Sequence, residues 1–212
     1  MIPPMQPISG VYAVTPDLAD TGLLVVKVRA VLAGGARLLQ YRNKPADHAT
    51  RRAQAAVLLD LCRHYDAALI INDDIELALE LDADGVHVGA DDAAIPSARA
   101  RLGSAKLIGA SCYDDLQRAR SAAAQGADYI AFGSFFASSV KPGAVRAQLS
   151  LLPAARQFGL PVVAIGGITA DNASPLIAAG ADAVAVISAL FSAPDPEAAA
   201  RRFSQLFQAS TV

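Results

Sequence analysis

The sequence lacks the features that mark a secreted or membrane-bound chain. It has only two cysteines in 212 residues, and because these are far apart in the chain, no disulfide framework is predicted. No basic segment followed by an apolar stretch opens the chain, and no apolar run approaches the roughly 20 residues that span a bilayer. We therefore expect a cytoplasmic protein with no membrane partner.

An excess of charge of one sign is also missing. The chain carries 18 basic and 20 acidic residues, interspersed, with a formal net charge of −2. It therefore offers no broad basic field for a nucleic acid. A small-molecule ligand is the better expectation, and the sequence leaves a homo-oligomer open.

Apolar residues are abundant. They make up 53% of the chain, and the mean hydropathy is +0.35, which predicts one compact domain with a large core. The opening M-I-P-P-M-Q-P contains three prolines. We expect residues 1–9 to form an N-terminal leader and residues 10–212 to form a single catalytic domain.

Short β-like runs alternate with Ala- and Leu-rich segments of helical spacing. The predicted strands are residues 11–15, 37–41, 68–71, 85–89, 107–111, 129–135, 161–165 and 183–187. The predicted helices include residues 50–64, 75–81, 116–124, 151–157, 172–179 and 196–207. Eight such units predict the α/β class, as a single-domain (β/α)8 TIM barrel. An open doubly wound sheet is the alternative, but no G-x-G-x-x-G follows the first strand.

Polar residues gather at the carboxyl ends of the predicted strands, where the loops of a barrel form its active-site mouth. Gln40, Arg42 and Lys44 are spaced by two, so in a strand they would point to one side. They form either a salt-bridged rim or a row that binds an anion. The chain has only four lysines, and two of them, Lys44 and Lys141, fall in these loops.

Paired acids follow the third and fourth predicted strands. Asp74 and Asp92 each precede a predicted helix, so capping explains one acid of each pair. The other acid could bind Mg²⁺, which usually takes one or two carboxylates together with phosphate oxygens and water. One Asp from each pair would suffice.

Glycine-rich and small-residue motifs end the last two strands. These are A-I-G-G-I-T and A-V-I-S-A, at the place where barrels often hold a phosphate on backbone N–H groups. A tight turn is the alternative reading of the two glycines. His87 alternates within the fourth strand, as a hydrogen-bonded core residue would. Two phosphate-binding ends in one mouth suit an enzyme that joins two phosphorylated molecules.

Several motifs resemble those of the thiamine-phosphate synthase family. They are V-Y-A-V-T-P-D, Q-Y-R-N-K, I-I-N-D-D-I-E-L-A-L, A-D-G-V-H-V-G-A-D-D, G-A-S, F-G-S-F-F-A-S-S-V-K, A-I-G-G-I-T-A-D-N and A-G-A-D-A-V-A-V-I-S. The resemblance runs in order from Val11 to about Ser192. It implies a (β/α)8 barrel that joins hydroxymethylpyrimidine diphosphate to a thiazole phosphate, or to its carboxylated form, and releases diphosphate.

The resemblance also implies roles for individual residues. Those expected to contact the pyrimidine diphosphate are Gln40, Arg42, Lys44, Asn72, Ser111 and Lys141. Those expected to hold the thiazole phosphate are Ser138, Gly167, Ile187 and Ser188, with the loop up to Val140. Asp73 and Asp92 would bind Mg²⁺. Lys141, Ser111 and Arg42 are the expected catalytic residues.

Three departures from the family pattern stand out. A-D-D replaces the usual Q-E-D, which keeps Asp92 but puts Ala90 in place of an amide. A-S-S-V-K replaces P-T-x-T-K, so Val140 lacks a hydroxyl group. Cys112 and Tyr113 replace an Ala-His pair, and the sequence assigns them no role.

Two alternatives remain at this point. A thiazole tautomerase would share the barrel but would not need the two aspartates, and it would rely on a histidine that this chain lacks after Ser111. A non-catalytic protein that binds a phosphorylated metabolite is the other alternative, and formation of product in a single turnover would exclude it.

Overall fold

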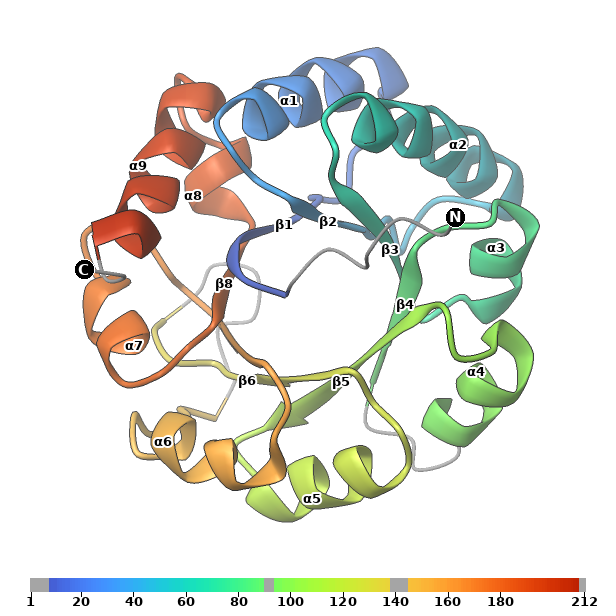
Figure 1. The fold of residues 1–212 in the computed structure, drawn as a ribbon. Helices are drawn as coiled ribbons and strands as arrows, with labels where there is room; N and C mark the ends of the chain where they lie inside the picture. The colour runs from blue at the N-terminus through green and yellow to red at the C-terminus, as the bar shows by residue number, and fades with distance from the viewer. Residues whose placement is uncertain (1–7, 90–93, 138–144, 210–212) are drawn as a thin grey trace.

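The protein folds as a closed barrel of eight parallel strands. The structure, a computed structural model, describes residues 8–89, 94–137 and 145–209. Each strand pairs with the next in chain order, and β1 also pairs with β8 to close the barrel. Figure 1 shows the helices as a ring around the strands. The (β/α)8 barrel predicted from the sequence is confirmed.

The strands and helices alternate along the chain. The strands are β1 Gly10–Val14, β2 Leu38–Tyr41, β3 Ala68–Asn72, β4 Gly85–Val88, β5 Leu107–Tyr113, β6 Tyr129–Phe132, β7 Val162–Ile165 and β8 Ala183–Val186. The helices are α1 Thr21–Ala33, α2 His48–His64, α3 Ile75–Glu80, α4 Ala94–Leu102, α5 Leu116–Ala124, α6 Leu151–Ala155, the 3-10 helix η1 Arg156–Phe158, α7 Ser174–Ala178, α8 Ser188–Phe191 and α9 Pro196–Ala209.

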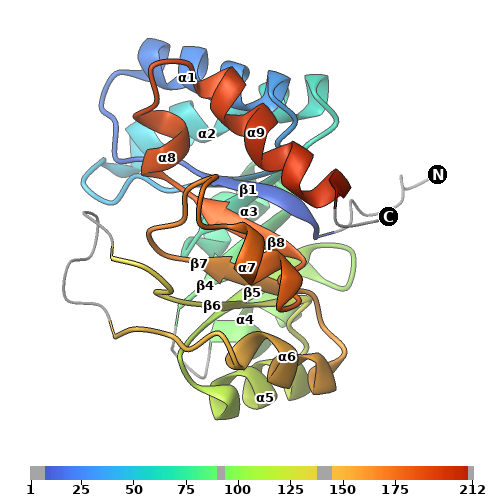
Figure 2. The same cartoon turned by 90° about the vertical axis from the view of Figure 1, so that its left-hand side faces the viewer.

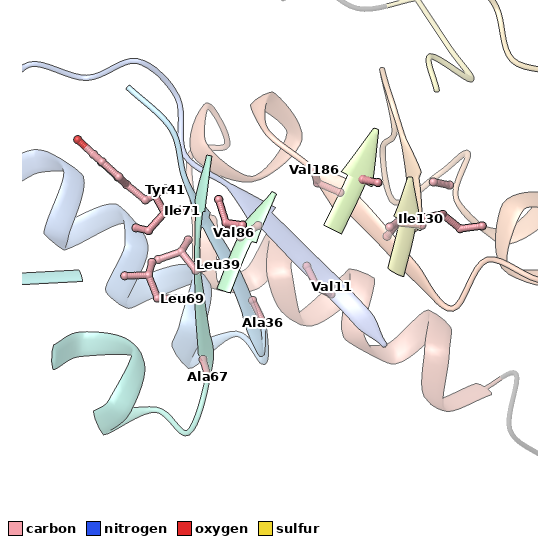
Figure 3. Close-up of a cluster of buried hydrophobic side chains, with 14 of the residues drawn as sticks. Val11, Ala36, Leu39, Tyr41, Ala67, Leu69, Ile71, Val86, Ile130 and Val186 are labelled. Atoms are coloured by element: carbon pink, nitrogen blue, oxygen red, sulfur yellow. The ribbon is translucent and has the colours of Figure 1, made fainter. Parts of the chain in front are cut away.

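Each strand has two buried faces, because its side chains alternate between the barrel interior and the surrounding helices. Figure 3 shows outward-pointing strand side chains such as Leu39, Leu69 and Val86. Their neighbours Leu38 and Ile70 belong to a second cluster, which fills the interior. This double burial explains why the strands read as nearly continuous apolar runs.

Aspartates begin four of the helices. The carboxylates of Asp20, Asp47, Asp74 and Asp115 accept hydrogen bonds from backbone N–H groups in the first turns of α1, α2, α3 and α5, at 2.7–3.0 Å. These caps satisfy donors that have no partner inside the helix. The capping explanation is therefore right for Asp74, and it leaves Asp73 without that role.

Three other aspartates tie neighbouring strands together at the opposite end of the barrel from the mouth. Asp84, Asp128 and Asp182 each precede an even-numbered strand. Their Oδ2 atoms accept from the backbone N–H of Leu69, Ile108 and Val162, each at 2.7 Å. We call these three contacts the carboxylate ties. Arg37 stands at the matching place before β2 and donates instead to two backbone carbonyls.

The helices pack in groups on the outside of the barrel. Figure 2 shows α1, α2 and α9 together on one side and α5 and α6 on the other, in agreement with the contacts between these helices. None of the helices within the described residues has the length and apolarity that crossing a bilayer requires.

Two predicted strands differ from those observed by two or more residues at their C-terminal ends. β6 stops at Phe132 and not at residue 135. Next along the chain, Gly133 packs on the backbone of β7, where a Cβ atom would lie 2.3 Å from the carbonyl oxygen of Ile165. β5 continues past Ser111 to Tyr113, with a register shift between these two residues in its pairing with β6. Such an irregularity is typical of a strand that aims a side chain into a site.

Candidate active site

Nine of the twelve sequence-predicted site residues fall in the described part of the chain, all at or just beyond the carboxyl ends of strands. They are Gln40, Arg42, Lys44, Asn72, Asp73, Ser111, Gly167, Ile187 and Ser188. The other three, Asp92, Ser138 and Lys141, lie outside the described residues, as do Ala90 and Val140. The described residues form three groups around the mouth.

The first group is the loop after β2, which the loop after β1 holds in place. Thr15, fully buried, accepts from the backbone N–H of Arg42 at 2.8 Å and donates to its carbonyl oxygen at 2.8 Å. Oδ1 of Asp17 accepts from Nη1 of Arg42 and from the backbone N–H of Lys44, both at 2.9 Å. β2 itself ends at Tyr41, so strand alternation does not align the three predicted residues. Hydrogen bonds from the neighbouring loop fix Arg42 and Lys44 instead.

The second group surrounds Asp73, directly after β3. Asp73 has a positive φ of 59°, donates its N–H to the carbonyl of His87 at 2.9 Å, and accepts from Nδ2 of Asn72 at 2.8 Å. Its Oδ1 faces the end of β4, where a Cβ on Gly89 would lie 3.8 Å away. No ion pair within the described residues involves its carboxylate, whereas Asp74 pairs with Arg51.

Asp73 thus offers a carboxylate of the kind that Mg²⁺ prefers, because its Oδ2 accepts from Asn72 while its Oδ1 takes part in no hydrogen bond within the described residues. Within the described ranges, no cluster of three or more His, Cys, Asp or Glu side chains could hold a metal. A magnesium site that uses one or two carboxylates together with a substrate's phosphate oxygens does not need such a cluster. The residues present fit that kind of site, and Asp73 is the described residue that could serve as a ligand in it.

A line of polar side chains crosses the barrel interior beneath the mouth. Gln40 Nε2 donates to the Tyr12 hydroxyl at 3.0 Å, and this hydroxyl lies 2.7 Å from that of Tyr129. The Tyr129 hydroxyl lies 3.1 Å from Nδ1 of His87, whose Nε2 lies 2.9 Å from Oγ of Ser111. We call these five residues the interior chain. It connects two predicted site residues, Gln40 and Ser111.

Burial keeps the interior chain uncharged. Desolvation lowers the pKa of His87 to about 4, against an opposing effect of the Asp73 carboxylate. Desolvation likewise raises the pKa of the Tyr12 and Tyr129 hydroxyls well above its usual range. At neutral pH the imidazole is therefore neutral and both hydroxyls keep their protons. His87 is a hydrogen-bonded core histidine, as the sequence indicated.

The third group lines a cavity of about 200 Å³ between the ends of β7 and β8. Most of the residues that line it are small, and the full set is Ala137, Ile165, Gly166, Gly167, Ile168, Thr169, Ala185, Val186, Ile187, Ser188 and Ala189. The short helix α8 begins here, at Ser188. The first N–H groups of a helix have no acceptor within it, so they are available to an anion. The cavity suits a phosphate group.

The two glycines of this cavity are needed for close packing. Gly167 has a φ of 62°, and a Cβ there would lie 2.2 Å from the carbonyl oxygen of Ala137. A Cβ on Gly166 would lie 2.1 Å from Oγ of Ser134. Asn172 braces the same loop, since it accepts from the N–H of Thr169 and donates to the carbonyl of Gly167. The loops after β6 and β7 are therefore in contact.

Several residues that shape the mouth do not stand out in the sequence. Tyr12, Thr15 and Tyr129 read as members of predicted strands, and the sequence assigns Asp17 no role. Only the alternation of β1 and β6 could have indicated that both tyrosines face the interior. Asn172 sits in a quoted motif, but its two hydrogen bonds to the loop depend on three-dimensional structure.

Cys112 and Tyr113, which replace Ala-His in the family pattern, point away from the interior chain. Cys112 is buried beneath the helices, and desolvation raises the pKa of its thiol to about 12. Tyr113 is 44% exposed, and the guanidinium of Arg118 lies 5.7 Å from its ring centroid. Neither residue contributes a side chain to the three groups described above.

The fold and the site together define a barrel enzyme that handles phosphorylated small molecules. The family model for thiamine monophosphate synthase matches residues 11–190, which is most of the barrel. The chain belongs to this family.

Relatives support the same assignment over almost the whole chain. A thiamine-phosphate synthase of Methylobacillus flagellatus is 60% identical over 203 residues, which is 96% of this chain and 97% of that protein. One from Thiobacillus denitrificans is 56% identical over 201 residues, covering 94% and 95% of the two chains. A solved structure of thiamine phosphate pyrophosphorylase from Pyrococcus furiosus is 35% identical, with a TM-score of 0.84 over 94% of this chain and 96% of that one.

Proposed function

We propose that this protein joins 4-amino-2-methyl-5-hydroxymethylpyrimidine diphosphate to 4-methyl-5-hydroxyethylthiazole phosphate, giving thiamine phosphate and diphosphate. The observation that carries this proposal is the presence of two ends suited to phosphate in one mouth. One end has the cation Arg42 and the carboxylate of Asp73, and the other has the cavity between β7 and β8. The names of its relatives in the same family support the same reaction.

The pyrimidine diphosphate would bind at the side of the mouth formed by β2, β3 and β5. Its proposed contacts are Gln40, Arg42, Lys44, Asn72, Ser111 and Lys141. Arg42 is the best suited of these to a diphosphate, because a guanidinium can donate to two oxygens at once. Its Nη1 is engaged by Asp17, which leaves its other donors for the ligand.

The thiazole phosphate would bind in the cavity between β7 and β8, on Gly167, Ile187, Ser188 and Ser138. The mouth would then hold the two substrates side by side. Alignment of this kind lowers the barrier by fixing the two reacting atoms before reaction.

The chemistry requires no protein nucleophile. The 4-amino group of the pyrimidine donates electrons toward the methylene carbon, the C–O bond breaks, and diphosphate leaves with the bonding electron pair. The thiazole nitrogen then attacks the methylene carbon to form the new C–N bond. Mg²⁺, when bound to Asp73 and Asp92, would stabilise the charge of the departing diphosphate. Arg42 and Lys141 would stabilise the same charge, and Ser111 would orient the pyrimidine.

The remaining assignments complete the proposal. Residues 10–212 form the catalytic barrel, and residues 1–9 precede it as a leader. The protein works in the cytoplasm with Mg²⁺ as its cofactor and small molecules as its partners. A homo-oligomer is compatible with this activity.

A direct assay tests the proposal. The protein is incubated with both substrates and Mg²⁺, and thiamine phosphate is measured by chromatography and mass spectrometry. Product should form only when both substrates and Mg²⁺ are present, and Lys141→Ala should lose most of the turnover. A protein that binds both substrates but forms no thiamine phosphate, even in a single turnover, would overturn the proposal in favour of a binding protein.

A further inference from the structure

The interior chain is a continuous run of hydrogen bonds through the middle of the barrel. Its members come from five strands: Gln40 from β2, Tyr12 from β1, Tyr129 from β6, His87 from β4 and Ser111 from β5. The outer two reach toward the mouth, and the inner three are at most 8% exposed. Because the polar side-chain atoms of these three residues are cut off from water, each atom needs a partner within the interior chain.

The backbone is shaped to hold Tyr129 at the centre of this run. Gly109 on β5 lies against its ring, and a Cβ there would be 2.0 Å from Cζ and 2.3 Å from the hydroxyl oxygen. The ring of Tyr12 meets it edge-on at 5.9 Å, and that of His87 lies tilted at 5.6 Å. These contacts leave the Tyr129 hydroxyl little freedom to choose other partners.

The positions of the protons give the interior chain a direction, from donor to acceptor along its hydrogen bonds. Gln40 Nε2 donates to the Tyr12 oxygen, and within the described residues the only other partner of the Tyr12 hydroxyl is Tyr129. The Tyr12 proton must therefore go to the Tyr129 oxygen. Tyr129 has one proton of its own, which then goes to Nδ1 of His87. With Gln40 donating to Tyr12, the opposite order would leave the buried Tyr12 proton without an acceptor, which is unfavourable.

The same reasoning assigns the hydrogen-bonding roles of the two residues that end the interior chain at the mouth. Since Nδ1 of His87 accepts, Nε2 carries the ring proton and donates to Ser111 Oγ. Ser111 is then left with its own proton to donate, and Gln40 with its Oε1 to accept. No hydrogen bond within the described residues uses either of these two groups. The interior chain thus ends in a donor, the Ser111 hydroxyl, and in an acceptor, Oε1 of Gln40.

We propose that Tyr129, together with Tyr12 and His87, is a positioning residue that fixes Ser111 as a hydrogen-bond donor and Gln40 as an acceptor, and so selects the ligand's ring. This inference rests on the proposed function. A ring that fits must present a donor to Gln40 and an acceptor to Ser111. A 4-aminopyrimidine does so with its amino group and a ring nitrogen, whereas a pyrimidine with a 4-oxo group lacks the amino donor.

The tautomer of His87 tests the direction of the chain without any ligand. Nitrogen-15 NMR of the histidine-labelled full chain separates the two tautomers, and His87→Gln assigns the signal. We expect the proton on Nε2. A proton on Nδ1 would mean that the hydrogen bonds of the interior chain run in the opposite direction. Ser111 would then donate to His87 and could only accept from a ligand, which would overturn the proposal.

A double-mutant cycle tests whether Tyr129 acts through Ser111. Calorimetry measures binding of the pyrimidine diphosphate with Mg²⁺, in the absence of the thiazole phosphate. Tyr129→Phe should weaken binding about 10-fold, the loss of roughly one hydrogen bond. In a Ser111→Ala background the same change should cost less than about 2-fold, because coupled residues are not additive. An undiminished loss in that background would overturn the positioning role.

Two controls separate this role from general damage. Tyr41→Phe removes a hydroxyl that is also buried and hydrogen-bonded, to Gln54 on the outside of the barrel. It should leave pyrimidine diphosphate binding unchanged, and Tyr129→Phe should leave thiazole phosphate binding unchanged. If Tyr129→Phe does not fold, Tyr12→Phe takes its place in the test, because it interrupts the interior chain at the neighbouring hydroxyl. A wild-type protein that fails to bind the pyrimidine diphosphate would overturn the proposed function and the ligand assignment, whereas the tautomer still decides the chain's direction.

Discussion

Asp17 holds Arg42 with the same carboxylate oxygen that holds the backbone of Lys44. Both contacts measure 2.9 Å and join the loop after β1 to the loop after β2. An acid at this place repels a diphosphate, so its presence in the mouth calls for a compensating role. One hydrogen bond fixes the guanidinium of Arg42 and the other fixes the backbone of Lys44 before the ligand arrives, which reduces the entropy lost on binding.

We expect Asp17→Ala to lower kcat/KM for the pyrimidine diphosphate by about 10-fold, since one charge-assisted hydrogen bond is lost. Asp17→Asn should retain most of the activity, because its amide oxygen can accept both bonds. Steady-state kinetics with each substrate varied in turn checks this. If Asp17→Ala binds the diphosphate more tightly than the wild type, Asp17 acts only by repulsion and the positioning role is wrong.

Asp73 and Asp74 are adjacent acids with different expected roles. Asp73→Asn should reduce kcat on the order of 10²-fold and raise the Mg²⁺ concentration needed for half-maximal rate. Asp74→Asn is the matched control, because asparagine also caps a helix well and should leave the rate nearly unchanged. Rates measured over a Mg²⁺ titration distinguish the two. Equal rates and equal Mg²⁺ dependence in both variants would remove Asp73 from the metal site.

Gly167 and Gly103 both have a positive φ but different surroundings. Their φ values are 62° and 72°, and a Cβ on Gly103 would meet nothing within 4 Å. Gly167→Ala should displace the loop at Ala137 and lower kcat/KM for the thiazole phosphate by about 10- to 100-fold. Gly103→Ala should lower only the melting temperature, because a side chain at positive φ is strained. Comparable kinetics in the two variants would show that the contact with Ala137 does not matter to the site.

The fold could be predicted from the sequence because each strand carries its own local signal. Seven of the eight strands end within two residues of the predicted position. Both faces of each strand are buried, so each strand is an apolar run whose ends are visible in the sequence. The exception is β6, where Phe135 continues the apolar run although the chain has already turned at Gly133. Gly133 packs against Ile165, 32 positions further along, and no local pattern contains this contact.

The site was only partly predictable, for a related reason. Strand ends indicated Asn72, Asp73 and the two glycines that follow β7, because their polarity or size stands out in the local sequence. The interior chain did not stand out, since Tyr12 and Tyr129 look like ordinary strand residues. Their hydroxyls meet across 117 positions of sequence, and only closure of the barrel brings them together.

Both cysteines should be inert while the protein is folded. They are buried, and desolvation raises the pKa of each thiol, that of Cys112 to about 12. A disulfide reagent at pH 8 should therefore release no chromophore from the native protein and two equivalents after denaturation, since the thiolate is the reactive form. Fast release of one equivalent from the folded protein would contradict this, and Cys112→Ala would show which thiol reacts.

The carboxylate ties should stabilise the barrel without affecting catalysis. Asp182→Ala leaves the N–H of Val162 without its acceptor and should lower the free energy of unfolding by about 1–3 kcal/mol. Asp171→Ala is the control, because that acid is 82% exposed and pairs with Arg202 on the surface. It should change stability by no more than about 1 kcal/mol. Denaturant titration and the activity assay together check both variants, and a loss of activity in folded Asp182→Ala would contradict the separation of roles.

The carboxylate ties also divide the barrel into units. Each tie joins two strands of a single pair, β3 with β4, β5 with β6, and β7 with β8, and no tie links one pair to the next. A break between β4 and β5 therefore severs none of them. The exposed turn at Gly103 lies on that connection. It is therefore a suitable place to relocate the chain ends or to insert a reporter domain, because all three carboxylate ties remain intact.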